Sequence, residues 1–324
     1  MRLLGVELTR YRSRRAVVLL LLLAAVIPLV IAVALVWDTR PISAADIARA
    51  EQLAAAEAEQ PYIQRELRRC EARPEQYIGP GGDAASCAEF VLPQADWYLA
   101  RNQLRLGEQV NGAGLAAVVV IGALVMIAGA TFAGADWASG SMSNQLLFDP
   151  RRAKVWAAKG LAVLLGGLVV ALAILVVFWT GLYVVAQLRD IDTGSTVQTV
   201  IRWQIVRGSA LVALAGLAGY ALTMLLRSTV GTLAAMFAYA VAGEIVLALL
   251  PFGGMGRWSL ANNTSAWIAG QITYWDNSLT CPRGGDSCDK SVVMTQADGA
   301  LFLMVLLAAV VAVSVVAFRR RDIP

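Results

Sequence analysis

Hydrophobic residues gather along this chain in long blocks that polar segments separate. Six blocks are each about 20 residues long, the length at which a helix crosses a hydrocarbon core about 30 Å thick. They cover 16–37, 112–133, 158–187, 208–226, 229–251 and 300–318. The composition agrees, with 58% hydrophobic residues and a mean hydropathy of +0.63. We therefore predict an all-α integral membrane protein with six transmembrane helices.

The first block has two interpretations. Five arginines precede it and a small-residue stretch follows it, as in a secretion signal. Its apolar core is much longer than the 7–15 residues of a cleaved signal, so we favour a retained membrane anchor. Residues 1–15 before it are basic and amphipathic, which predicts a helix lying along the membrane surface.

Charge in the connecting segments predicts the orientation. The segments 1–15, 134–157 with the adjoining Lys159, the 227–228 turn and 319–324 carry thirteen basic and four acidic residues. The alternate segments 38–111, 188–207 and 252–299 carry fourteen basic and eighteen acidic residues. Because positive segments stay inside, we expect a multi-pass protein of the cell membrane with both termini in the cytoplasm.

Two of the outer segments are too long to be simple turns. The first, 38–111, is rich in helix-forming residues, and we expect helices on both sides of Pro61, a cap at Asp46 and a third helical piece near 93–109. Together they would form a helical extracellular cap. The segment 252–299 combines glycines with tryptophans, which favours short interfacial or re-entrant helices.

All four cysteines fall in these outer segments. Cys70 and Cys87 share the first, and Cys281 and Cys288 share the last. Two disulfides within the loops are the natural interpretation in an oxidising compartment, and four free thiols are the alternative. The chain contains no histidine, so we predict no metal site.

The segment 134–157 is unusually polar for its place between two apolar blocks. Asp149-Pro150 predicts the start of a helix, and Ser139 or Ser141 could cap a shorter helix that presents Met142, Leu146 and Leu147. A short helix with an apolar side is suited to docking on another protein. An ordinary helical turn with positive flanking residues is the alternative.

The order of polar motifs resembles a known family. After the basic start "VELTRYRSRR", the chain carries a pattern of acidic residue, S-G-S, P-x-R and K, and it ends in "FRRRDIP". The pattern positions are Asp136, Ser139, Gly140, Ser141, Pro150, Arg152 and Lys159. This layout is similar to the membrane subunit of an ABC exporter of the ABC-2 type, in which the acidic position is commonly Glu.

The resemblance implies a function and a set of partners. It implies that 137–148 is a cytoplasmic coupling helix seated on a separate ABC ATPase, with the N-terminal helix beside it. Two ATPase copies would serve two permease subunits, as a homodimer or a heterodimer, in the lipid membrane and without nucleic acid. ATP and Mg would be bound by the ATPase, and this chain, which has no phosphate-binding loop, would hold no cofactor and would not itself be an enzyme.

Candidate site residues follow from the resemblance. The expected contacts with the ATPase are Asp136, Ser139, Gly140, Met142, Leu146, Leu147, Arg151 and Arg152, joined at the N-terminal interface by Glu7, Arg10 and Arg12. No catalytic residue is predicted.

Glu244 is the one acidic residue inside a predicted span. It could line a translocation path, or it could reach water near the outer end without a transport role. A non-transporting scaffold or regulator bound to an ATPase is the alternative function for the whole chain.

Overall fold

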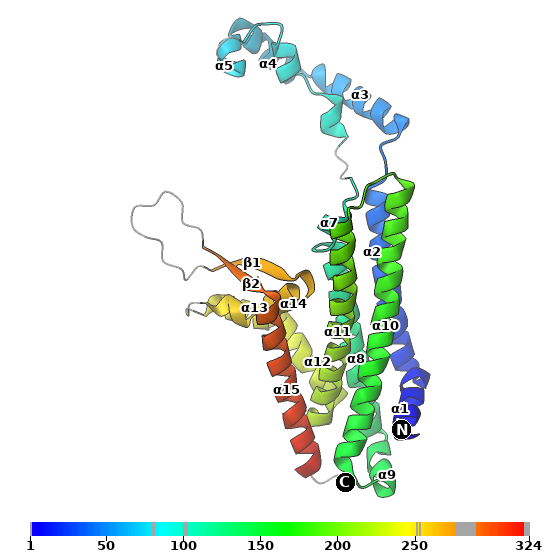
Figure 1. Ribbon diagram of the computed structural model, residues 1–324. Coiled ribbons are helices and arrows are strands. Elements are labelled where there is room, and N and C mark those ends of the chain that lie inside the picture. Colours follow the sequence, from blue (N-terminus) through cyan, green and yellow to red (C-terminus); the bar gives the residue numbers. More distant parts are fainter. Residues whose placement is uncertain are drawn as a thin grey trace. The chain divides into compact units, whose positions relative to one another are not determined.

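The computed structural model describes residues 2–79, 82–99, 103–250, 252, 254–276 and 290–320. Helices make up 81% of it, and six helices in the described part are long and apolar enough to cross a membrane. The chain divides into two compact units, residues 34–104 and the remainder, and each is described by itself (Figure 1).

The larger unit is a bundle built around three long helices. These are α8 (Ala113–Ala138), α10 (Arg152–Leu188) and α11 (Ser195–Leu226), with the short α7 (Leu106–Gln109) leading into α8. A side chain at Gly129 would place its Cβ 2.2 Å from the carbonyl oxygen of Gly216, and one at Gly219 would lie 2.1 Å from that of Met126. The backbones of α8 and α11 therefore touch, which small residues permit in membrane bundles.

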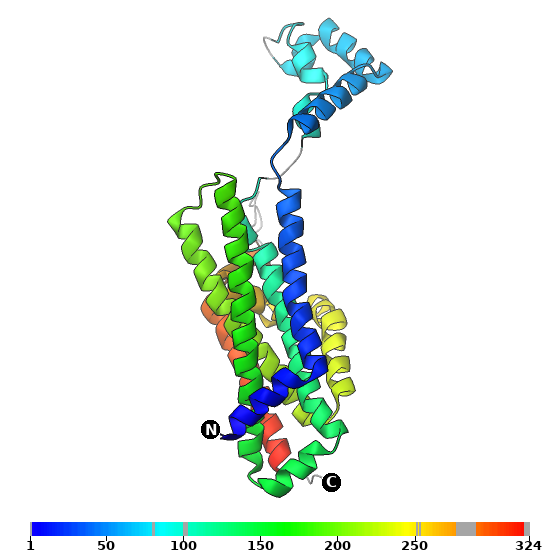
Figure 2. The same cartoon turned by 90° about the vertical axis from the view of Figure 1, so that its right-hand side faces the viewer.

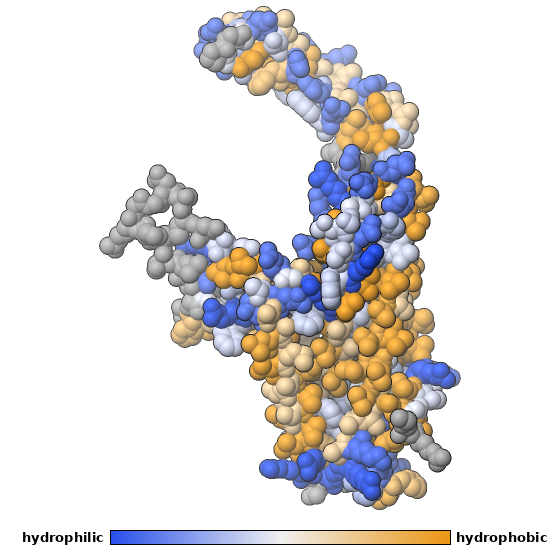
Figure 3. Space-filling model, viewed as in Figure 1, coloured by the Kyte–Doolittle hydropathy of each residue, from blue (hydrophilic) through white to orange (hydrophobic). Residues whose placement is uncertain are grey.

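The other long helices lie at the edge of this core. They are α2 (Arg15–Asp38), α12 (Thr229–Ala238) and α15 (Gln296–Arg320), each with large exposed apolar side chains such as Leu22, Phe237 and Leu301. Figure 3 shows a hydrophobic surface over the sides of the bundle and hydrophilic residues at the end where α15 terminates. This distribution suits a bundle whose sides face lipid.

Near that end, two short helices complete the bundle. The helix α1 (Arg2–Ser13) lies against α10, and α9 (Ser141–Phe148) connects α8 to α10 (Figure 2). Arg152 of α10 donates to the backbone carbonyl of Arg319 at 3.3 Å, so the end of α15 lies there too.

Two predicted boundaries differ from the structure. The helix α11 begins at Ser195, so most of the predicted loop 188–207 is helical. The prediction missed this part of the helix because its polar residues interrupt the apolar block. The predicted span 229–251 is interrupted by the π-helical turn η2 (Tyr239–Gly243), after which α13 (Glu244–Leu249) continues.

The segment 252–299 is only partly helical. It contains a 3-10 turn η3 (Met255–Trp258) and α14 (Leu260–Ala269), as short helices were expected, but also two strands that were not. The strands β1 (Gln271–Trp275) and β2 (Ser291–Thr295) pair antiparallel, with Gln271 opposite Thr295. Their β-branched and aromatic side chains favour this pairing over helix. Cys281 and Cys288 lie outside the described residues.

The smaller unit consists of short helices. These are α3 (Ala44–Ala58), α4 (Pro61–Ala72), α5 (Pro74–Ile78), α6 (Cys87–Val91) and the 3-10 turn η1 (Ala95–Tyr98). The predicted break at Pro61 is confirmed. The cap of α3 is Ser43, and Asp46 completes a capping box three residues later instead of serving as the cap itself. Of the helical piece expected near 93–109, the described residues contain η1 and α7.

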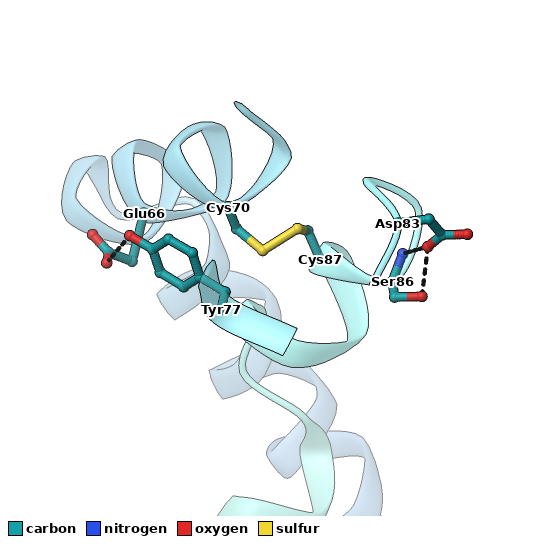
Figure 4. Close-up of a disulfide and its surroundings, with 6 residues drawn as sticks. All are labelled: Glu66, Cys70, Tyr77, Asp83, Ser86 and Cys87. Atoms are coloured by element: carbon teal, nitrogen blue, oxygen red, sulfur yellow. Dashed lines mark hydrogen bonds between the residues drawn. A yellow bond between two sulfur atoms is a disulfide. The ribbon is translucent and has the colours of Figure 1, made fainter. Parts of the chain in front are cut away.

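A disulfide joins two of these helices. Cys70 of α4 and Cys87 of α6 are bonded and fully buried, which confirms the first predicted pair (Figure 4). Nearby, the hydroxyl of Tyr77 donates to Glu66 at 2.9 Å, and the backbone N–H of Ser86 donates to Asp83 at 2.8 Å. On the chain-entropy description, closing a loop of this length stabilises the fold by about 3 kcal/mol.

Candidate functional site

A buried ionic cluster lies where α1, α8, α9 and α10 meet. At its centre is Lys159 of α10, which is fully buried. Its Nζ atom lies 3.0 Å from Oε2 of Glu7 on α1 and 2.5 Å from Oδ2 of Asp136 on α8. One ammonium group thus joins carboxylates from two other helices, and both carboxylates are also fully buried.

Two arginines add positive charge to the cluster: Arg10 of α1, and Arg14, which lies between α1 and α2. The Nη2 atom of Arg10 lies 3.0 Å from Oδ1 of Asp136, and Arg14 pairs with the same oxygen. Arg14 also donates to the backbone carbonyl of Phe132 at 3.1 Å. Three cations thus surround two carboxylates, so the cluster of Glu7, Arg10, Arg14, Asp136 and Lys159 carries one net positive charge.

The short helix α9 is tied to this cluster by neutral side chains. The hydroxyl of Ser141 accepts from Nη2 of Arg10 at 2.9 Å, and Nε2 of Gln145 donates to Oε1 of Glu7 at 2.7 Å. The position of α9 therefore depends on the same residues that bind Lys159 of α10.

Aromatic rings close the cluster on one side. The ring of Phe132 lies 5.1 Å from the guanidinium carbon of Arg14 and 5.4 Å from Nζ of Lys159. Tyr11 packs edge-on against the same ring at 5.3 Å. These rings exclude water, which strengthens the ion pairs and makes any unpaired charge there costly.

Glycine sets the corner between α8 and α9. Gly140 has a φ of 68°, in the left-handed region that glycine adopts easily, and it occupies the N-cap position of α9. Ser139 and Ser141 therefore do not cap the helix, contrary to the prediction. Ser139 instead donates to the carbonyl of Ala135 in the preceding turn at 2.8 Å.

The predicted start of α10 is also displaced. Arg151 occupies the N-cap position, and Asp149 lies two residues earlier, where its carboxylate accepts from the backbone N–H of Arg151 at 3.2 Å. Lys154 lies 3.1 Å from the same carboxylate, and its hydrogen bond is the main cause that lowers the pKa of Asp149. This exposed pair is separate from the buried cluster.

The two sides of α9 differ sharply. Met142 is fully buried in the hydrophobic core and Leu146 is partly buried against it. Leu147 and Phe148 are 82% and 92% exposed. The apolar surface that α9 presents therefore consists of Leu147 and Phe148, and the assignment of Met142 to a docking surface is wrong for this conformation, because the side chain faces inward.

The remaining predicted residues are divided among several places. Arg12 and Arg151 are exposed, whereas Arg152 binds the end of α15. Glu244 does not bind any residue of the ionic cluster. It accepts from the hydroxyl of Tyr239 and the backbone N–H of Ala261, both at 3.0 Å. Its carboxylate thus lies at the N-terminus of α14, where a negative charge is favourable.

Two cluster members, Arg14 and Lys159, were not among the predicted site residues. Arg14 had been noted only as part of the basic start, and Lys159 as a basic residue for orientation and as the last position of the family pattern. Gln145, which donates to Glu7, was not considered. One feature of the sequence could have indicated the ionic cluster: Lys159 lies at the very start of an apolar block. An unpaired ammonium group is unfavourable there, so a nearby carboxylate is expected.

In the described part of the chain, no three His, Cys, Asp or Glu side chains converge as metal ligands would. No family model, curated protein or solved structure matches this chain.

Proposed function

We propose that this chain is the permease subunit of an ATP-driven exporter of the ABC-2 type. In this proposal the end of the bundle that carries α1 and α9 faces the cytoplasm, as the distribution of basic residues favours. A second permease subunit completes the translocation path, and two separate ATPase subunits bind ATP and Mg.

The observation that carries the proposal is the exposed pair Leu147 and Phe148 on α9. Two adjacent large apolar side chains, almost fully exposed and followed by Asp149 and Arg151, are more typical of a protein contact than of a free surface. The helix is short and fixed at its other side, so it can present them rigidly to a groove in a partner.

The ionic cluster supports the same proposal because it links α9 to the bundle. A displacement of α9 acts on Ser141 and Gln145, and these bind Arg10 and Glu7. Glu7 in turn binds Lys159 of α10. Movement of a docked ATPase would therefore reach a helix of the bundle through direct contacts, without bending of flexible loops.

The test is co-purification of an ATPase with the tagged chain from native membranes. Leu147→Asp/Phe148→Asp is expected to remove a stoichiometric ATPase while membrane insertion is retained, because two carboxylates cannot enter an apolar groove. Leu188→Asp is the matched control: Leu188 is 80% exposed but terminates α10 at the opposite end of that helix.

Two results would overturn the docking assignment. One is an unchanged amount of ATPase with the double variant, and the other is an equal loss with Leu188→Asp. Transport is tested separately with the reconstituted complex: an ATPase that binds while no substrate moves on ATP hydrolysis would favour the scaffold or regulator.

A further inference from the structure

The end of α15 lies beside the short helix α9. Phe318 of α15 belongs to the same buried hydrophobic cluster as Met142 of α9, and Leu146 packs against that cluster. Phe318 also packs edge-on against Trp137, near the end of α8, at 6.2 Å. The residues that follow Phe318 therefore leave the bundle next to α9.

The start of α10 is fixed at the same place. The Nη1 atom of Arg152 donates to the backbone carbonyls of Arg319 and Phe318, at 3.3 Å and 3.5 Å. These carbonyls lie in the last turn of α15, where a cation is favourable at the negative end of the helix. Three elements that are far apart in the sequence, α9, the start of α10 and the end of α15, thus share one end of the bundle.

The segments 149–154 and 318–320 form a surface that is strongly positive, which we call the basic surface. Its basic residues are Arg151, Arg152, Lys154, Arg319 and Arg320, and all but Arg152 are exposed. Asp149 is the one carboxylate of these two segments, and it pairs with Lys154 at 3.1 Å. Five basic residues and one acidic residue leave a net charge of +4 on the basic surface.

Three of these cations have no carboxylate partner among the described residues. They are Arg151, Arg319 and Arg320. The carboxylates of Glu7 and Asp136 are not available to them, because both are buried and bind Lys159. Exposed charges of one sign repel each other and attract a surface of the opposite sign. The basic surface therefore fits a partner that brings acidic side chains.

The exposed apolar pair of α9 adjoins the basic surface. Leu147 and Phe148 directly precede Asp149 in the chain and are 82% and 92% exposed. An apolar centre with polar and charged residues around it is the usual anatomy of a protein interface. The pair and the basic surface together thus have the composition of one docking site.

Anionic lipid is the other class of partner that exposed arginines attract. The sides of the bundle are hydrophobic, whereas hydrophilic residues gather at the end where α15 terminates (Figure 3). Arg151, Lys154 and the apolar pair belong to the connection between α8 and α10 at that end. This placement favours a partner in the aqueous phase, and lipid is treated below as an outcome of the test.

We propose that the basic surface binds an acidic rim around the apolar groove that receives Leu147 and Phe148. The inference rests on the proposed function, in which the groove belongs to a separate ATPase, and it adds the end of α15 and the charge of the partner to that interface. The apolar pair supplies most of the affinity, while the charges accelerate association and orient the partner. Salt is therefore expected to weaken the complex.

The experiment measures binding of the ATPase, stripped from the native complex, to the tagged full chain in phosphatidylcholine nanodiscs. Binding is compared at about 0.1 M and about 1 M NaCl, where charges are screened beyond about 10 Å and about 3 Å. Arg319→Glu/Arg320→Glu is expected to weaken binding about tenfold at the lower salt concentration and much less at the higher one. Arg319→Lys/Arg320→Lys keeps both charges and is expected to bind like the wild type.

A matched control changes the net charge by the same amount elsewhere. Arg202 near the start of α11 and Arg257 in η3 are both exposed, and Figure 1 shows these elements away from α9. Arg202→Glu/Arg257→Glu is therefore expected to leave ATPase binding unchanged. Charges at the end of a span also influence its orientation, so protease accessibility of a C-terminal tag in sealed vesicles is measured for each variant. Where glutamates alter it, Arg319→Gln/Arg320→Gln replaces them, and the salt dependence of the wild type needs no substitution.

Four results would overturn the inference. ATPase binding that ignores both salt and Arg319→Glu/Arg320→Glu, but is lost in Leu147→Asp/Phe148→Asp, would exclude the acidic rim and leave the proposed function standing. Equal weakening by the control would show an unspecific charge effect. An effect of Arg319→Glu/Arg320→Glu that appears only after phosphatidylglycerol is added to the nanodiscs would assign the basic surface to lipid. Absence of any ATPase from the wild-type chain would overturn the proposed function and this inference together.

Discussion

Asp136 and Glu244 are two carboxylates of the same bundle that are stabilised in different ways. Asp136 is fully buried and faces the cations Lys159, Arg10 and Arg14. Glu244 is partly exposed and accepts from two neutral donors, the Tyr239 hydroxyl and the Ala261 backbone. The first carboxylate connects helices far apart in the chain, and the second connects a π-helical turn to the adjacent α14.

The difference shows which parts of the bundle are bound to move together. Around Asp136, displacement of any one helix separates buried charges, which is strongly unfavourable. Around Glu244, neutral hydrogen bonds can be exchanged for water at modest cost. The π-helical turn η2 beside it is the kind of irregularity at which helices often adjust for function. We therefore expect α1, α8, α9 and α10 to behave as one body and α13 and α14 to adjust more independently.

The largest expected effect comes from removing the central cation. Lys159→Met leaves buried Glu7 without its ammonium partner, and we expect a loss of about 3 kcal/mol in stability. Unfolding by SDS titration in mixed micelles measures it.

Two further variants test whether burial is the cause. Lys154→Met removes a lysine whose ion pair with Asp149 is exposed, so its effect should be below about 1 kcal/mol. The double variant Lys159→Met/Glu7→Gln should recover part of the loss. Similar effects of Lys159→Met and Lys154→Met would contradict the comparison.

A smaller effect is expected from the glycine contact in the bundle core. Gly129→Ala places a methyl group 2.2 Å from the carbonyl oxygen of Gly216, which must push α8 and α11 apart at a cost of about 1–3 kcal/mol. Gly181→Ala in α10 is the control, because nothing lies within 4 Å of its Cβ position. It should be neutral or slightly stabilising. The melting temperatures of the two variants in one detergent would decide, and equal values would exclude a tight α8 and α11 contact.

The smallest effect is expected at Glu244. Glu244→Gln removes the charge but keeps an oxygen acceptor for Tyr239 and Ala261, so its stability should change by less than about 1 kcal/mol. The corresponding change at the buried site, Asp136→Asn, should cost several times more because two arginines and a lysine lose their counter-ion. The same SDS titration compares them, and a larger loss at Glu244 would reverse the proposed order.

The sequence predicted the spans well because hydrocarbon length and helix geometry leave little choice. The blocks at 16–37 and 300–318 lie within helices α2 and α15, and Cys70 and Cys87 are bonded as expected. Predictions failed where local signals compete. Asp46 and Ser43 are both good caps, and only the backbone around residue 43 decides between them.

The polar segment after α8 contains a short helix, as predicted, but the sequence did not show which of its apolar side chains are exposed. Met142 and Leu147 lie on one short helix and are both apolar, yet one is buried and the other exposed. Their difference depends on the direction in which Gly140 turns the chain, which the residue pattern does not contain.

Six membrane-length helices, the positive end of the bundle and the cysteine pair of the first long loop could be predicted from the residue pattern, because each depends on length, charge or proximity along the chain. The ionic cluster of Glu7, Asp136 and Lys159, in contrast, follows from the packing of the helices and could not be predicted from that pattern. Their positions are separated by up to 152 residues. Charges so distant in sequence come together only when helix packing removes water from between them, and the energy of that packing is a property of the whole bundle.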